Sequence, residues 1–312
     1  MGTGDFTHVS VLLDESVSAL RIRPDGVYLD GTLGGGGHAR EVAKRLSPEG
    51  RLIGIDQDEE AIRAAGETLA PYGEKVRIYR NNFRNFREVL REDGTDKVDG
   101  ILLDLGISSH QIDDPSRGFS YMHDGPLDMR MDQDGPVTAA DLVNTLPKEE
   151  LVRILRDYGE EKFAARIAEA IVRERVKSPL STTAQLSALI RQAVPAKADG
   201  GHPAKRSFQA LRIAVNEELT ILSEVLEDMI DALSSGGRIA VISFHSLEDR
   251  IVKTTFRRCE HPCICPPDLP VCVCGKRPKG QVITRHPVLP GEDETKHNPR
   301  AKSAKLRVFE KK

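Results

Sequence analysis

The chain has 312 residues, and its 45 lysines and arginines are nearly balanced by 48 acidic residues, for a formal net charge of -3. This balance excludes a uniformly basic nucleic-acid coat protein, and the lack of tryptophan with only 4% aromatic residues argues against a wide base-stacking surface. No apolar run is long enough to span a membrane and the first ten residues carry no signal segment, so we expect a cytoplasmic protein without membrane partners.

A glycine-rich segment follows the first predicted strand, 27–29. It reads Asp30-Gly-Thr-Leu-Gly-Gly-Gly-Gly37 and leads into a helix-like stretch over 39–46. Strand, glycine loop and helix in this order present bare backbone N–H groups to a cofactor. The next predicted strand, 51–56, ends at Asp56, where a carboxylate can accept hydrogen bonds from a ribose diol.

Two cofactors suit this layout, a dinucleotide and S-adenosylmethionine. The spacing Gly34-x-Gly36-x-x-Ala39 matches the dinucleotide pattern, which is a weak signal alone. Asp30 would repel a pyrophosphate but attract the ammonium group of a methionine moiety. The segment therefore favours S-adenosylmethionine.

Strands and helical stretches then alternate, which predicts a parallel sheet of Rossmann-like α/β type. The alternation stops between 111 and about 200, where an ordered loop over 117–136 and helices are expected. We therefore predict a discontinuous sheet domain, 1–110 and 205–312, with an inserted helical domain, 111–204. Further strands are expected at 76–79, 98–104, 238–243, 281–284 and 305–309. Helices are expected at 148–176 and 182–194, with one apolar face running through 207–233.

Candidate catalytic residues follow two of the strands. Asp104 ends one strand and precedes a loop containing Ser108, and His245 and Ser246 follow another. In open α/β sheets ligands bind outside the carboxyl ends of the strands, so Asp104, Ser108 and His245 are candidates for substrate contact. Asp104 and Ser246 also suit helix N-caps, and these alternatives stay open.

Two polar segments are candidate RNA contacts. Lys205, Gln209, Arg212 and Asn216 form a stripe at steps of four, three and four, which suits either a solvated helix face or phosphate and base contacts. The basic run 297–307, with Arg300 and Lys302, suits contact with an RNA backbone.

Five cysteines lie close together among prolines, over 259–274. Cys263, Cys265, Cys272 and Cys274 form two Cys-x-Cys pairs, which depart from the usual Cys-x2-Cys spacing of zinc sites. A structural zinc site, a loop staple and reduced thiols are the alternatives.

Taken together, these segments resemble one family over nearly the whole chain, the bacterial 16S ribosomal RNA cytosine-N4 methyltransferases of the MraW family. The matching blocks, in order, are HVSVLL (8–13), DGTLGGGGH (30–38), LDLGISS (103–109), RGFS (117–120), PLDMRM (126–131), FQALRIAVN (208–216), SFHSLEDR (243–250) and NPRAKS (298–303).

The resemblance implies a methyltransferase sheet that binds S-adenosylmethionine and methylates N4 of a cytidine in the decoding region of 16S rRNA, within the 30S subunit and not in DNA. The cofactor contacts that it implies are Gly36, Gly37, His38, Asp56, Phe83, Asp104 and Gln111. Many amino-methyltransferases carry an Asp/Asn-Pro-Pro-aromatic motif after the fourth strand, but residues 104–107 read Asp-Leu-Gly-Ile. We therefore expect Asp104 or a nearby carbonyl to accept the N4 proton, with Ser108 and His245 close by.

Three competing functions share part of this pattern. An NAD-dependent oxidoreductase would share the glycine loop but not the Asp30-Gly-Thr form. A non-catalytic ribosome-assembly factor would not need the cofactor residues. A DNA amino-methyltransferase would be expected to carry the missing Pro-Pro-aromatic motif.

Overall fold

The computed structural model describes residues 10–195, 201–266, 271 and 273–312, and the chain divides into two units. Met1–Gly106 and Leu219–Lys312 form the first unit, and Ile107–Glu218 forms the second. The second unit therefore begins before and ends after the expected insertion, 111–204. It extends to Glu218 because helix α10 (Lys205–Val215) contributes Phe208, Ala210 and Leu211 to its hydrophobic core.

Within the described residues, seven strands form one sheet in the order β3-β2-β1-β4-β5-β7-β6. The five strands from β3 to β5 pair in parallel, and β7 pairs antiparallel with both β5 and β6. The expected Rossmann-like α/β sheet is confirmed, as is the closing pair of strands near the C-terminus. The strands are β1 (Val27–Asp30), β2 (Arg51–Asp56), β3 (Val76–Arg80), β4 (Val98–Asp104), β5 (Leu233–Ser243), β6 (Gly280–Val282) and β7 (Lys305–Lys311).

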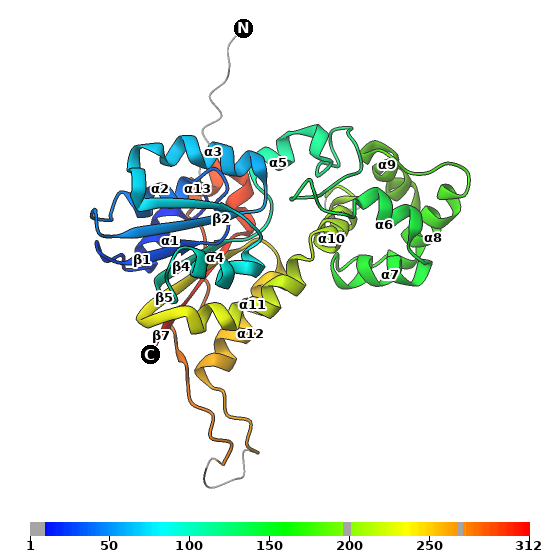
Figure 1. Ribbon diagram of the computed structural model, residues 1–312. Coiled ribbons are helices and arrows are strands. Elements are labelled where there is room, and N and C mark those ends of the chain that lie inside the picture. The colour runs from blue at the N-terminus through cyan, green and yellow to red at the C-terminus, as the bar shows by residue number, and fades with distance from the viewer. Residues whose placement is uncertain (1–9, 196–200, 267–270, 272) are drawn as a thin grey trace. The chain divides into compact units, whose positions relative to one another are not determined.

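Helices cover both faces of the sheet (Figure 1). Alternate residues of a strand point to opposite faces, so Leu29 packs in one core with α4, α11 and α12, while its neighbour Tyr28 packs in another with α1, α2 and α3. The helices of this unit are α1 (Leu13–Ala19), α2 (Gly37–Ala43), α3 (Glu59–Leu69), α4 (Phe86–Glu92), α11 (Glu218–Ala232), α12 (Ser246–Glu260) and α13 (Glu292–His297), with 3-10 turns η1 (Ala70–Lys75), η2 (Phe83–Asn85) and η4 (Pro299–Ser303).

The second unit is built from helices around a core of its own, and its described residues contain no strand. The expected loop over 117–136 is ordered by Arg117, whose buried guanidinium donates to the carbonyls of Arg130 and Met131. The remaining elements are α5 (Ser109–Asp113), η3 (Pro115–Arg117), α6 (Ala139–Thr145), α7 (Lys148–Asp157), α8 (Ala164–Arg175) and α9 (Thr183–Ala193).

The apolar face expected to run through 207–233 is divided between two helices. α10 ends at Val215 and α11 begins at Glu218, and of the two residues between them Glu217 has a left-handed backbone with φ 51°. Such a conformation cannot continue a right-handed helix. The apolar periodicity persists across the break, and for this reason the sequence pattern did not reveal it.

Among the described residues, none of the helices combines the length and the apolar character that crossing a membrane requires.

Candidate active site

Three acidic residues end three neighbouring strands of the sheet. Asp56 ends β2, Asp30 ends β1 and Asp104 ends β4. The chain runs from β1 outward in one direction to β2 and β3 and later in the other to β4 and β5, so β1 and β4 flank the point where the strand order reverses. Ligands of open α/β sheets bind at this point, beyond the carboxyl ends of the strands.

The glycine loop lies at the same edge, between β1 and α2. The Gly34 N–H donates to Asp56 Oδ2 over 2.8 Å, and Gly36, at the N-cap position of α2, has φ 80°, a conformation that favours glycine. A Cβ on Gly37 would meet Ser10 Oγ, so a side chain at this position would displace the Ser10 hydroxyl. The expected glycine turn is therefore held in place by the hydrogen bond from Gly34 to Asp56.

The backbone of Asp104 is hydrogen-bonded to this loop, but one oxygen of its carboxylate has no donor among the described residues. Its N–H donates to Thr32 Oγ1 over 2.6 Å, and its Oδ2 lies 3.7 Å from His38 Nδ1. Its Oδ1 is buried and has no hydrogen-bond partner in the described structure. A buried carboxylate oxygen without a donor is costly, and at a ligand edge it indicates that the donor comes from a bound molecule. Asp104 is not the helix N-cap that was the alternative, since Ser108 caps α5.

His38 is oriented by the N-terminal segment. Its Nε2 lies 3.0 Å from the Val11 carbonyl, which can only accept, so Nε2 carries a proton and Nδ1 faces Asp104. Sequence reasoning did not predict this contact or the one from Thr32, because both need backbone positions that only the fold supplies.

Burial raises the pKa of all three strand-end acids. Loss of water raises the pKa of Asp30 to about 7, opposed by the Thr32 N–H, and the pKa of Asp56 to about 6, opposed by the N–H groups of Asp58 and Gly34. The pKa of Asp104 lies well above its usual value, first from burial and then from the charges of Asp30 and Glu248. A positively charged ligand bound here would lower these pKa values and favour the ionised carboxylates, so the site suits such a ligand.

One consequence is a loss of stability as pH rises in the ligand-free protein. The pKa of Asp30 is about 7 in the folded protein and 3.8 in the unfolded chain. Its contribution to the free energy of unfolding is therefore complete below pH 3.8 and is lost as pH rises through 7. Relative to Asp30→Asn, we expect the wild type to lose on the order of 4 kcal/mol between these limits. Thermal unfolding of both proteins from pH 4 to 8 measures this, and parallel profiles would contradict it.

His245 caps the N-terminus of the helix that follows it. It is the N-cap of α12, with Nδ1 accepting from the Glu248 N–H at 3.4 Å and Nε2 lying 3.3 Å from Glu248 Oε1. Buried Glu248 in turn accepts from the N–H groups of Phe244 and His245. The N-cap of α12 is therefore His245 and not Ser246, which was the alternative from the sequence. Both ring nitrogens of His245 face Glu248.

The other predicted cofactor and catalytic residues divide between the units. Phe83 begins η2, and a Cβ on Gly31 would lie 3.5 Å from its Cβ, which places Phe83 beside the glycine loop. Ser108 and Gln111 belong to the second unit, where they form the reciprocal capping box of α5. Their catalytic and cofactor roles stay predictions from the resemblance and the loop pattern.

The polar stripe on α10 is largely used inside the second unit. Arg212 forms a two-point ion pair with Glu218 at 2.8 Å, and Gln209 donates to the Tyr158 carbonyl. The side chain of Asn216 accepts from the Met131 N–H and donates to the carbonyls of Met129 and Arg212. These contacts give Arg212 and Asn216 a structural role in holding the 117–136 loop and the α10 end, and their contact with RNA stays a prediction.

Lys205, Arg300 and Lys302 are exposed and remain candidate RNA contacts. The basic run 297–307 is otherwise partly structural, since Lys305 and Arg307 pair with Asp249 on α12.

Asn216→Ala tests the structural role. It leaves the Met131 N–H and Met129 carbonyl without their partner, so we expect about 1–3 kcal/mol of destabilisation. Chemical denaturation followed by helical signal measures it, with exposed Lys205→Ala on the same helix as the matched control, expected to change stability by less than about 0.5 kcal/mol. An Asn216→Ala protein of normal stability that binds RNA poorly would instead favour a direct contact of Asn216 with RNA.

The predicted zinc ligands lie between α12 and β6. Cys263, Cys265 and Cys274 are close together, while Cys272 lies outside the described residues.

The edge residues fit S-adenosylmethionine. That ligand carries an ammonium and a sulfonium, which suit a group of buried acids, and a ribose diol, which suits the carboxylate of Asp56 beside the loop. The orphaned Oδ1 of Asp104 offers an acceptor to such a ligand or to its substrate. A pyrophosphate would be repelled by the ionised forms of Asp30 and Asp104 and would gain no charge attraction from their protonated forms, so a dinucleotide fits less well.

Comparison with known proteins agrees with this chemistry. A model of the MraW methylase family matches residues 5–312. Ribosomal RNA small subunit methyltransferase H 2 of Agathobacter rectalis is 58% identical over 310 residues, covering 98% of this chain and 99% of its own length. The ribosomal RNA small subunit methyltransferase H of Symbiobacterium thermophilum is 56% identical over 308 residues, covering 98% and 97%. A solved rRNA methylase from Streptococcus thermophilus aligns over 97% of this chain and 98% of its own, with 11% identity and a TM-score of 0.45. The chain belongs to the MraW methylase family, and S-adenosylmethionine is its cofactor.

Proposed function

We propose that this protein methylates N4 of a cytidine in the decoding region of 16S rRNA, in the cytoplasm and within the 30S subunit. Relatives above 50% identity over nearly their whole length are named for methylation of small-subunit ribosomal RNA. The observation that carries the chemistry is the buried, unpartnered Oδ1 of Asp104, at the edge where the cofactor fits.

The cytidine amino group is a weak nucleophile because its lone pair is delocalised into the ring, and it must lose a proton when it is methylated. Bound S-adenosylmethionine supplies an electrophilic methyl group. Asp104 accepts the N4 proton through Oδ1, and its raised pKa makes its carboxylate a stronger base than an exposed aspartate. Thr32 holds the backbone of Asp104 in position.

A cytidine inside a helix cannot present N4 to such a site, so the base must be unstacked, at a cost of a few kcal/mol. Contacts to the surrounding RNA would offset this cost. Exposed Lys205, Arg300 and Lys302 are candidates for these contacts. In the second unit, a groove between α8 and α9 is lined by Arg166, Arg173 and Gln192 together with the acidic Glu169, and its two arginines are further candidates for contact with a phosphate backbone.

Transfer of labelled methyl from S-adenosylmethionine tests the proposal, with 30S subunits, protein-free 16S rRNA and DNA compared side by side. Nucleoside analysis of the product should show N4-methylcytidine from the subunit or the RNA and none from DNA. Labelling at another atom or nucleoside would refute the N4 assignment, and labelling of DNA alone would refute the substrate class.

A further inference from the structure

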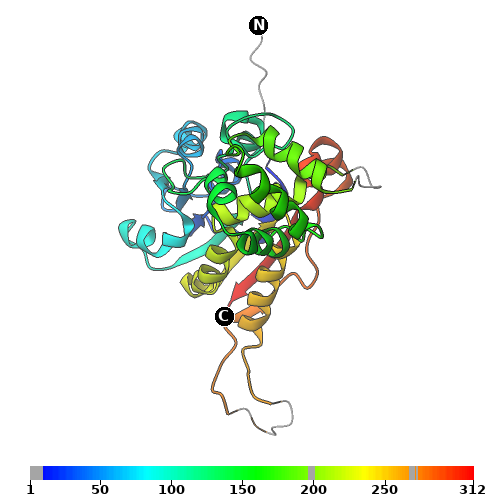
Figure 2. The same cartoon turned by 90° about the vertical axis from the view of Figure 1, so that its right-hand side faces the viewer.

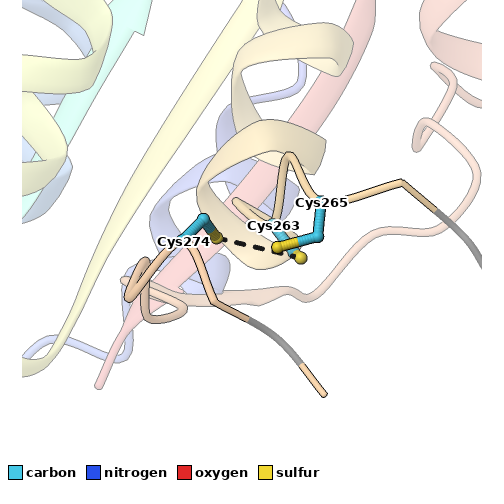
Figure 3. A group of neighbouring side chains, drawn as sticks. All are labelled: Cys263, Cys265 and Cys274. Atoms are coloured by element: carbon cyan, nitrogen blue, oxygen red, sulfur yellow. Dashed lines mark hydrogen bonds between the residues drawn. The ribbon is translucent and has the colours of Figure 1, made fainter. Parts of the chain in front are cut away.

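Three cysteine side chains converge in the segment between α12 and β6. Cys263 and Cys265 lie shortly after α12, and Cys274 lies shortly before β6. Their Sγ atoms all lie within 4.8 Å of one another, and those of Cys263 and Cys274 are 3.9 Å apart. Figure 3 shows the side chains turned toward one another from the two arms of the segment, which both Figures 1 and 2 show extending beyond α12.

These distances match a metal-thiolate site. Zinc–sulfur bonds are about 2.3 Å long, so two thiolates at the tetrahedral angle around one ion lie about 3.8 Å apart. A disulfide needs its sulfurs at about 2.05 Å and uses only two of them. We propose that Cys263, Cys265 and Cys274 bind a zinc ion that ties the two arms of this segment together.

A backbone contact already stabilises one of the sulfurs. The Val273 N–H donates to Cys265 Sγ over 3.4 Å, and an N–H donor favours a thiolate over a thiol. Lys276 and Arg277 follow Cys274 in the sequence and are exposed, so they provide positive charge near a site in which three thiolates exceed the charge of the ion. Structural zinc sites prefer four tetrahedral ligands, so these three thiolates leave one coordination position for a further donor.

The described residues of this segment also lack apolar packing that would hold its two ends together. The apolar side chains of Ile264 and Val273 are 69% and 75% exposed, so they do not build a core that would hold the arms together. Short segments without a core are commonly held by a metal or by disulfides. Zinc would therefore fix the shape of this extension, independently of the methyl-transfer site.

Metal analysis of the full-length protein, purified under reducing conditions without chelator, tests the proposal. We expect about one zinc per chain, lost in Cys263→Ser and Cys274→Ser. Cys259→Ala is the matched control, because Cys259 lies on α12 with its side chain buried in the core, and its substitution should leave the zinc content unchanged. Cobalt substitution should give a thiolate charge-transfer band and the visible bands of a tetrahedral ion, and both should vanish in Cys274→Ser.

Three results would overturn the proposal. They are wild-type protein that holds neither zinc nor cobalt, a Cys274→Ser variant that retains the full metal content, and an intact mass showing that two thiol hydrogens are lost to a disulfide. Should a variant fold poorly, chelation of wild-type zinc gives an independent test, since it should speed proteolysis within 261–279 and leave cleavage elsewhere unchanged. None of these measurements depends on methyl transfer, so the zinc proposal and the proposed function can fail separately.

Discussion

Replacing Asp104 by asparagine should lower the single-turnover rate of methyl transfer by about 10²–10⁴-fold, the range for loss of a positioned general base. Asparagine keeps the shape of the side chain and the backbone bond to Thr32, but it cannot take the N4 proton. The wild-type rate should also rise with pH as Asp104 ionises, because burial raises its pKa well above the usual value. In the variant this rise should disappear.

Asp96→Asn is the matched control, since Asp96 is exposed and lies just before the strand that Asp104 ends. It should leave the rate and the pH profile unchanged. Cofactor binding and thermal unfolding of the Asp104→Asn protein establish that it is folded. Unchanged turnover, or a pH dependence that survives the substitution, would exclude Asp104 as the base and favour a carbonyl of the adjoining loop.

The affinity for S-adenosylmethionine should fall as pH is lowered through 7. A cationic ligand favours the ionised form of Asp30, whose pKa burial raises to about 7, so binding below that pH must release a proton. One such proton weakens binding by up to about tenfold per pH unit. Asp56, with a pKa of about 6, extends the effect to lower pH.

Asp30→Asn should weaken binding of S-adenosylmethionine by about 10–100-fold at pH 8, the scale of one charge-assisted hydrogen bond. It should also lower by one the number of protons released when the cofactor binds at low pH. Titration calorimetry from pH 5.5 to 8, in buffers of different ionisation enthalpy, measures both quantities. Exposed Asp25→Asn is the control and should behave as the wild type. A wild-type affinity that is constant over this range would show that Asp30 does not face the positive charge of the cofactor.

Much of the sheet was predictable because its strands are short apolar runs that end in polar residues. Asp30, Asp56 and Asp104 were placed at one edge from this pattern alone, since the carboxyl ends of parallel strands share an edge. The helix break at Glu217 was not predictable, because apolar spacing continues through a single left-handed residue. The contacts of the stripe on α10 were not predictable for a related reason, since periodicity shows that residues share a face but not what that face contacts.

The sequence by itself determined the class of sheet, the glycine loop and the acids that follow the strands, because strand, turn and helix propensities are local properties. Only the tertiary structure decided how those acids behave. Burial raises their pKa values, and long-range contacts set the partners of His38 and Asp104. It likewise gathered Cys263 and Cys274 from the two arms of one segment. Distances and desolvation depend on which distant residues the fold brings together, and no local pattern of residues carries that information.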